Sequence, residues 1–246
     1  MTKMRVPIFP YPGGKGRLAR TLVSMMPQEG TTYVEPFAGR GNVFFAAALN
    51  LNFQAWVIND LRTSRFFEAL IKRGSAVTVP QRTQAEFNKQ KRCFRKGSYR
   101  AELLAPYLTF AGGGYKRGSF GNLRGANRAN YTQTLRDSSR ILTKIRPTIQ
   151  QKDWKELDWS TLDENAFVYF DPPYLGCDVR AYSSACFDYG GLIRLLKSAR
   201  FKWMLSEYDK PLYLRAFGKP FCTLSVQLIC DGKGEKQRNE CVWKNY

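Results

Sequence analysis

The most specific chemical signal in the chain is the tetrapeptide Asp171-Pro172-Pro173-Tyr174. Four apolar residues, 167–170, precede it, so we expect it at the carboxyl end of a buried strand, where ligands bind in open α/β sheets. The two prolines fix φ and remove two backbone donors. The Asp171 carboxylate and the nearby carbonyls then form a rigid surface of acceptors, which suits an exocyclic amino group, and Tyr174 can stack on a base. Such a site works by positioning and electrostatics, without a strong base. The alternative is an ordinary turn after a strand.

A second candidate site is the turn Glu35-Pro36-Phe37-Ala38-Gly39-Arg40-Gly41, between a predicted strand at 31–36 and a predicted helix at 42–50. Glycines here let the backbone turn sharply and let a ligand approach. Asp60 ends the next predicted strand, 55–59, and an acid at that place accepts hydrogen bonds from ribose hydroxyls. No phosphate-binding loop follows, so an adenosine with a methionine tail fits better than a dinucleotide. A tight turn with a solvated Asp60 is the alternative.

The segment Tyr11-Pro12-Gly13-Gly14-Lys15 adds a cation to these two sites. Lys15 is expected to pair with the carboxylate of the methionine tail, or else to be a surface lysine.

Composition restricts the chemistry and the partner. The 246 residues contain 39 Lys and Arg against 20 Asp and Glu, a net charge of +19, which favours a polyanionic partner. The absence of His excludes His-based general bases, Ser-His triads and His metal sites, and none of the six cysteines form Cys-x-x-Cys. We therefore expect no metal. The chain shows no apolar signal core and no 18-residue apolar run, so we expect a soluble, cytoplasmic protein in a bacterial or phage-infected cell, with no membrane partner.

The order of predicted elements indicates an α/β fold with an insertion. A helix at 16–26 and strand-turn-helix-strand-helix over 31–72 open the fold, and the pattern returns with strands at 167–170 and 202–206 around a helix at 192–199. Two last strands are predicted near 222–229 and 240–243, linked by a polar stretch. We expect a catalytic domain formed by 1–75 and 150–246, and an inserted region, 76–149. Residues 89–146 hold 14 basic residues and two acids.

The inserted region is expected to bind double-stranded DNA. An amino group paired inside a duplex must be flipped out to reach a pocket. Residues 111–131 are rich in Gly, Lys, Arg and aromatic residues and suggest a loop that contacts phosphates and base edges. The candidate DNA-binding residues are Tyr115, Lys116, Arg117, Phe120, Asn122, Arg124, Asn127 and Arg128.

The motifs Tyr-x-Gly-Gly-Lys, Glu-Pro-Phe-x-Gly-x-Gly, Asn59-Asp60 and Asp-Pro-Pro-Tyr, in this order, resemble the DNA adenine methyltransferase (Dam) family. The resemblance implies a Rossmann-like class I methyltransferase sheet with an inserted, mainly helical and loop-rich target-recognition region. It also implies S-adenosyl-L-methionine as cofactor and adenine as target, with Asp171 and Tyr174 holding the base. The cofactor-binding residues that it implies are Tyr11, Gly14, Lys15, Glu35, Phe37, Gly39, Gly41, Asp60 and Asp171.

Other functions stay open at this point. Adenine in structured RNA would suit the same motif, as would an inactive nucleic-acid-binding protein of the same fold. A cytosine amino methyltransferase would be favoured by Ser at position 171, and ring-carbon methylation lacks a Pro-Cys nucleophile. We expect a monomer, with a dimer on DNA as the alternative. The recognition sequence and the biological setting, whether restriction-modification, host maintenance or phage protection, are not determined.

Overall fold

A computed structural model describes residues 5–11, 13–109, 114–116, 119–121, 127–175, 187–229 and 235–246, with only the backbone of 226–229 and 235–238. The α-helices are α1 (Ala19–Ser24), α2 (Asn42–Asn50), α3 (Ser64–Arg73), α4 (Gln84–Arg95), α5 (Tyr99–Leu108), α6 (Arg128–Ile145), α7 (Tyr189–Ser198) and α8 (Pro211–Phe217). The strands are β1 (Glu29–Glu35), β2 (Asn52–Asn59), β3 (Thr148–Gln150), β4 (Phe167–Phe170), β5 (Lys202–Glu207), β6 (Cys222–Ile229) and β7 (Glu235–Lys244). Two short 3-10 helices, Trp154–Glu156 and Trp159–Thr161, precede β4.

The described strands form one sheet in the order β3-β2-β1-β4-β5-β7-β6, in which only β7 runs antiparallel to its neighbours. The strand order reverses between β1 and β4. Connections from β1 lead to β2 and β3 on one side, and connections from β4 lead to β5 on the other. Open α/β sheets bind ligands at the carboxyl ends of the strands beside such a reversal.

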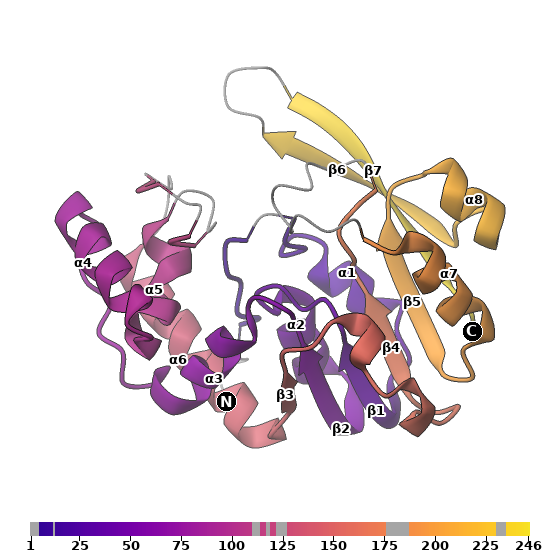
Figure 1. Cartoon of the computed structure of the whole chain (residues 1–246), viewed down its shortest axis with the longest axis horizontal. Coiled ribbons are helices and arrows are strands. Elements are labelled where there is room, and N and C mark those ends of the chain that lie inside the picture. The colour runs from indigo at the N-terminus through magenta and orange to yellow at the C-terminus, as the bar shows by residue number, and fades with distance from the viewer. Residues whose placement is uncertain are drawn as a thin grey trace.

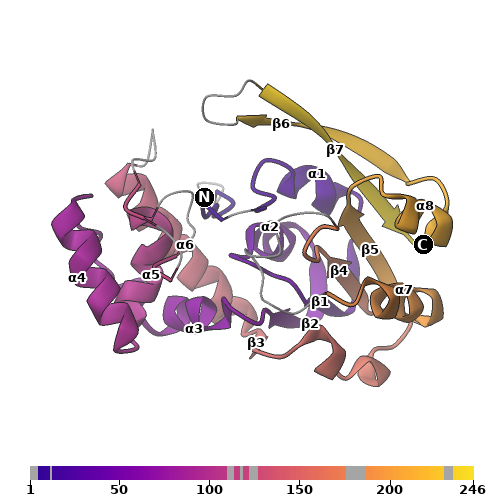
Figure 2. The ribbon, with the colours of Figure 1, turned by 45° about the horizontal axis from the view of Figure 1, so that its top comes forward.

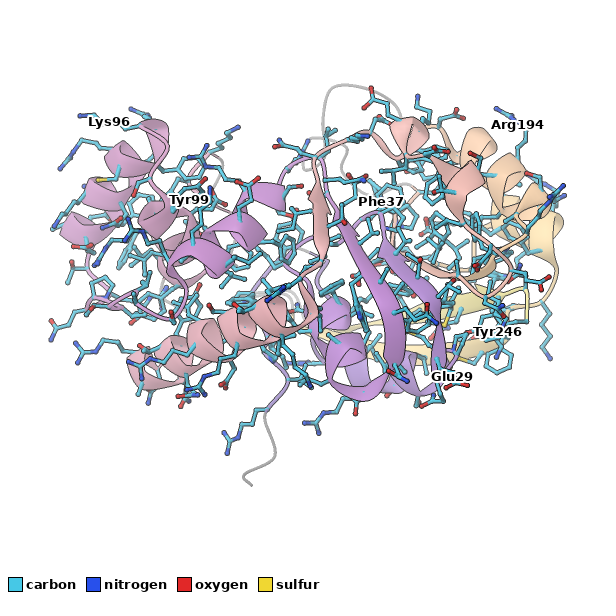
Figure 3. The ribbon with its side chains drawn as sticks, turned by 90° about the horizontal axis from the view of Figure 1, so that it is seen from below. Glu29, Phe37, Lys96, Tyr99, Arg194 and Tyr246 are labelled. Atoms are coloured by element: carbon cyan, nitrogen blue, oxygen red, sulfur yellow. The ribbon has the colours of Figure 1, made fainter. Side chains whose placement is uncertain are left out.

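The core lies on both faces of this sheet, and β4 shows why. All four of its side chains are buried, as expected for a central parallel strand covered on both sides. Phe167 and Tyr169 point into the core shared with α1, α2 and α3, whereas Val168 and Phe170 point into the core beneath α7. In Figure 3, Glu29 begins β1, the neighbouring strand, and Phe37 lies two residues beyond its end, so the two labels mark the amino and carboxyl ends of the parallel strands.

Helices α3 to α6 gather beside the β3 edge, whereas α7 and α8 lie at the other end of the molecule (Figures 1 and 2). The helical group is joined to the sheet by a continuous apolar core, because Phe87, Leu104 and Leu135 belong to the same buried cluster as Phe44 and Phe66. Pro106 in the last turn of α5 is buried there as well. The region expected as an insertion is therefore packed onto the sheet through α3.

The side chain of Asn42, the first residue of α2, binds the backbone of the amino-terminal segment. Its Oδ1 accepts the Phe9 amide at 2.8 Å, and its Nδ2 donates to the Phe9 carbonyl at 3.1 Å. Both groups of Phe9 are buried, so Asn42 satisfies them in place of water. This contact aligns the chain that continues to Lys15.

The α/β class with a mainly parallel sheet is confirmed, and most predicted elements are present with shifted ends. The first helix is shorter than the predicted 16–26, because residues 16–18 form a turn. The last strand was predicted too short: pairing with β6 extends β7 back to Glu235 through residues expected in a polar link. Residues 235–239 of that link are polar, but they pair with β6 in an antiparallel pair of strands, and backbone hydrogen bonds between strands do not require apolar side chains. Across the described ranges, no helix has both the length and the apolar character needed to cross a membrane.

We predict that Asn42→Ala lowers the free energy of unfolding by about 1–3 kcal/mol, because it leaves two buried backbone groups without partners. Urea denaturation measures this, and protease cleavage before residue 16 should accelerate. Asn50→Ala, at the other end of the same helix, is the matched control and should change stability by less than about 0.5 kcal/mol. Equal effects of the two substitutions would contradict the role of Asn42.

Candidate active site

Acidic residues converge at the carboxyl edge of the parallel strands. Glu35 ends β1, Asp60 follows β2, Asp171 follows β4 and Glu207 ends β5. Glu240, on the antiparallel strand β7, comes to the same edge because Cys241 pairs with Glu207 in the sheet. The reversal of strand order thus brings five acids from distant parts of the chain to one edge.

Lys15 is the cation at the centre of this edge. Its Nζ lies 2.8 Å from Asp171 Oδ1 and 3.5 Å from Glu240 Oε1, and it donates to the Gly13 carbonyl at 3.2 Å. The ammonium also lies 4.4 Å from the centre of the Tyr174 ring, and the Tyr174 hydroxyl donates to Glu240. The residues predicted as catalytic are therefore held by two partners, one from each end of the chain.

Burial and charge oppose each other in this cluster. Burial lowers the pKa of Lys15, but the Asp171 and Glu240 carboxylates outweigh it and raise the pKa above its ordinary value. Burial raises the pKa of Asp171 and of Glu240, and the Lys15 ammonium counteracts this in both. The ammonium is thus the group that allows a carboxylate to stay ionised here.

The other partners of the tetrapeptide make it rigid. The Tyr189 hydroxyl donates to the Pro173 carbonyl at 3.0 Å, and the edge-to-face pair of Tyr174 and Tyr208 has ring centres 4.6 Å apart. Glu207 accepts the Leu175 amide at 3.1 Å and the Tyr208 amide at 2.8 Å. Glu207 therefore fixes the backbone that leaves the tetrapeptide.

The predicted cofactor turn has the close backbone approach that its glycines suggest. Gly39 and Gly41 have φ of +55° and +74°, which favour glycine. A Cβ on Gly39 would lie 3.0 Å from the Tyr11 ring, and one on Gly41 would lie 2.8 Å from the Phe67 ring. The Tyr11–Lys15 segment and the turn after β1 are thus in contact.

Asp60 braces this turn. Its Oδ2 accepts the Gly39 amide at 2.9 Å, and its Oδ1 accepts the amides of Arg62 and Thr63 at 2.8 and 2.9 Å. The Asn59 side chain donates to the Pro36 carbonyl in this turn. It also donates to the Lys152 carbonyl and accepts the Lys152 amide, in the segment after β3. Contact of Asp60 with a ribose stays a prediction. A carboxylate can accept about four hydrogen bonds, so a ribose hydroxyl could donate to Asp60 beside the three amides.

The residues at this edge fit the predicted cofactor. Phe37 is half-buried against Phe170 and Phe187, which makes an apolar wall for a purine. Glu35 is buried beside Tyr33, whose hydroxyl lies 3.1 Å from Oε2, and burial raises the pKa of Glu35 well above its ordinary value. Gly14, next to Lys15, is exposed. Apolar surface, acids and a cation are the groups that an adenosine with a charged methionine tail requires.

The structure directs Lys15 at Asp171 and Glu240. The sequence pattern had suggested the methionine carboxylate as its partner, and that pairing stays a prediction. Glu240 and Glu207 were missed. Glu207 carries the same signal as Asp60 and Asp171, an acid at the end of an apolar strand, but Glu240 precedes its apolar run and only the antiparallel pairing brings it to this edge.

The candidate DNA-binding residues divide into packed and exposed groups. The Tyr115 ring is buried against Phe87 and Phe94, so its placement in an exposed loop is wrong: an aromatic ring of this size gains more by joining the core. Phe120 is half-buried against Phe87. Asn127 caps α6, and Lys116, Asn127 and Arg128 are exposed. Arg117, Asn122 and Arg124 lie outside the described residues.

Arg40 links the turn after β1 to the helical group. Its guanidinium lies 4.3 Å from the Phe66 ring centre and forms a buried ion pair with Glu102 of α5 at 3.4 Å.

No three His, Cys, Asp or Glu side chains within the described ranges are arranged to hold a metal ion.

The pKa of Glu207 gives a test of this geometry. Burial raises it from 4.5 to about 7, although the two amides oppose the shift. Between pH 4.5 and about 7, Glu207 keeps a proton in the folded state that it releases in the unfolded state. This proton stabilises the folded state fully below pH 4.5, and the stabilisation is lost as the pH rises through about 7. From pH 5 to 8, we predict that wild type loses up to roughly 3 kcal/mol of stability relative to Glu207→Gln.

Chemical denaturation at several pH values measures this difference. Glu164→Gln changes an exposed acid and should follow wild type at every pH. Parallel curves for wild type and Glu207→Gln would contradict the buried, raised carboxyl.

Residues 11–96 match the model of the D12 class N6 adenine-specific DNA methyltransferases, a segment that includes Tyr11–Lys15, the turn after β1 and Asp60. The chain is also similar to the modification methylase StsI of Streptococcus sanguinis, with 24% identity over 187 residues. The similarity covers 67% of this chain and 28% of that protein, so the chain spans about a quarter of the relative's length. The resemblance to the DNA adenine methyltransferase family that the four motifs predict is therefore confirmed, with the family model matching the segment that holds the first three of them.

Proposed function

We propose that the chain is a DNA methyltransferase that transfers the methyl group of S-adenosylmethionine to the 6-amino group of a flipped adenine. The observation that carries this proposal is the placement of Asp171-Pro172-Pro173-Tyr174 beside Lys15 and Glu240, at the edge that also holds the turn after β1. A methyl donor and a base bound there would share Asp171 as a neighbour.

The cofactor supplies a sulfonium methyl that is already activated when bound. The chain's own residues would hold it: Phe37 would lie against the purine, Asp60 would accept from the ribose, and Lys15 would pair with the charged tail. The Gly39–Gly41 turn would allow close approach of the backbone.

Asp171 accepts a hydrogen bond from the adenine amino group, and Tyr174 stacks on the base. On transfer, the bond from the amino nitrogen to the methyl carbon would form as the sulfur–carbon bond breaks, and positive charge would develop on that nitrogen. The Asp171 carboxylate, which the Lys15 ammonium at 2.8 Å helps to keep ionised, would stabilise this charge in place. The nitrogen then loses its proton to solvent, and no strong base is required.

We predict that Asp171→Asn lowers methyl transfer by at least ~10²-fold, because the amide removes the negative charge. Incubation with labelled S-adenosylmethionine and either duplex DNA or structured RNA measures this, and binding of DNA and of the cofactor should change little. Glu164→Gln, which changes an exposed acid before the start of β4, is the control.

The outcomes separate the candidate functions. Transfer to RNA alone would identify an RNA enzyme, no transfer by wild type would indicate a binding protein, and strong residual transfer by Asp171→Asn would refute the role of Asp171.

We predict that DNA binds along the helical group. Replacing the exposed residues Arg128, Arg136 and Arg140 with Ser should weaken binding and lower the salt slope, d log K/d log[salt], by about 2 to 3 in magnitude. The control replaces Arg194, Arg200 and Arg215, which are exposed at the α7–α8 end. Fluorescence anisotropy at several salt concentrations measures both, and an equal loss in the control would place the DNA elsewhere.

A further inference from the structure

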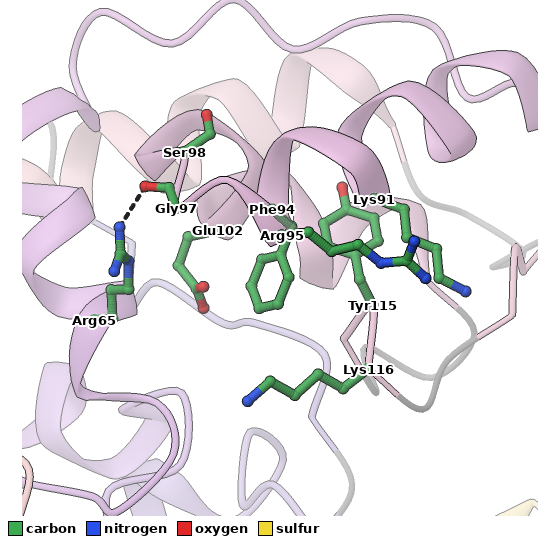
Figure 4. A pocket seen from close by; sticks show the side chains of 9 residues that line it. All are labelled: Arg65, Lys91, Phe94, Arg95, Gly97, Ser98, Glu102, Tyr115 and Lys116. Carbon is green, nitrogen blue, oxygen red and sulfur yellow. Dashed lines mark hydrogen bonds between the residues drawn. The ribbon is translucent and has the colours of Figure 1, made fainter.

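The helical group contains a pocket of about 480 Å³ that the proposed methyl transfer does not use. It lies between the start of α3, the end of α4, the start of α5 and the segment 114–116 (Figure 4). Pockets of this size hold small ligands. Three kinds of group surround it: cations, aromatic rings and one carboxylate.

Four cations line the pocket: Arg65, Lys91, Arg95 and Lys116. Arg95 and Lys116 are exposed, and neither takes part in an ion pair within the described ranges. Arg65 donates to the Gly97 carbonyl and so stays at the rim (Figure 4). This density of positive charge suits a phosphate group.

Phe94 and Tyr115 form an aromatic wall. Their ring centres lie 5.4 Å apart, and Tyr115 is buried while Phe94 is half-buried. Packing against Phe87 holds Tyr115 in place. Phe94, a fixed ring with part of its surface open, provides a platform on which a base can stack.

Glu102 is the carboxylate, and it distinguishes this pocket from a simple anion site. It is buried, and Figure 4 shows it pointing into the pocket between Arg65 and Phe94. Arg40 lies 3.4 Å from its Oε1 on the side of the turn after β1. A buried carboxylate repels a bare anion but accepts hydrogen bonds from the amino group of a base.

We propose that this pocket binds a nucleotide whose base carries an exocyclic amino group, with the base against Phe94 and its amino group on Glu102. The phosphate lies among Arg95, Lys116 and Lys91. A uracil or thymine presents carbonyl oxygens in place of the amino group and is repelled by Glu102.

Two sources supply this ligand chemistry: a free nucleotide, or an unpaired nucleotide of bound nucleic acid. The second source rests on the proposed function, whereas the first is independent of it. In both cases, a ligand bound to Glu102 is linked to the turn after β1 through the ion pair of Glu102 with Arg40.

Calorimetric titration of the full chain with dCMP and dUMP tests the proposal, because these ligands share size and phosphate and differ at the amino group. We expect dCMP to bind at least fivefold tighter than dUMP, and the variant Arg95→Ser/Lys116→Ser to weaken dCMP at least tenfold. The test changes the base of the ligand and leaves Glu102 in place, because removing the Glu102 carboxylate would leave the buried Arg40 without its partner.

The matched control is Arg194→Ser/Lys197→Ser, which removes two exposed cations of α7 outside the pocket and should leave dCMP binding unchanged. Equal affinity for dCMP, dUMP and inorganic phosphate would overturn the proposal, as would an equal loss in the control. Displacement of dCMP by a duplex with an unpaired cytosine, but not by a fully paired duplex, assigns the ligand to DNA. If dCMP stays bound in the presence of either duplex, the ligand of the pocket is a free nucleotide. Methyl transfer is measured separately, so failure of one proposal does not decide the other.

Discussion

The ion pair of Lys15 with Asp171, extended by Glu240, is the interaction on which the site depends. It joins the amino-terminal segment, the end of β4 and the antiparallel strand β7, which are far apart in the chain. Buried charges are costly unless they are paired and hydrogen-bonded, so the loss of Lys15 would leave the two carboxylates without compensation. The cluster therefore requires the amino-terminal segment to be in place, and the hydrogen bonds from Asn42 to Phe9 provide that placement.

The same edge of the sheet shows how one polar group can have two roles. Asp60 and Glu207 each accept backbone amides from the loop after their own strand and from the loop after a neighbouring strand, and these bonds set the loops before any ligand binds. A site formed in this way loses little conformational entropy on binding. For a reaction that proceeds by positioning and electrostatics, such preorganisation is the main contribution that the protein can make.

The helical group is coupled to the site by its core and by one buried ion pair. Arg40 belongs to the turn after β1, yet its charge is balanced by Glu102 of α5 and its guanidinium stacks on Phe66. A ligand that engages Glu102 from the pocket side would act on the partner of Arg40. This gives a physical route by which a ligand in the pocket and the turn after β1 can affect each other.

The sequence by itself determined the α/β class, the strand-turn-helix at 31–50 and the position of Asp171 after a buried strand, because these depend on local periodicity, glycine and proline. Through motif order it also suggested Lys15, Asp60 and Asp171 as candidate site residues, and the structure brings them to one edge of the sheet. Only the tertiary structure decided that Lys15 pairs with Asp171 and Glu240, that Tyr115 is buried and that β7 extends back to Glu235. Glu240 could not be found from its own neighbours, since an acid before an apolar run reaches the carboxyl edge only if its strand runs antiparallel. That direction is set by pairing with β5 and β6, which are contacts between segments that the local sequence does not specify.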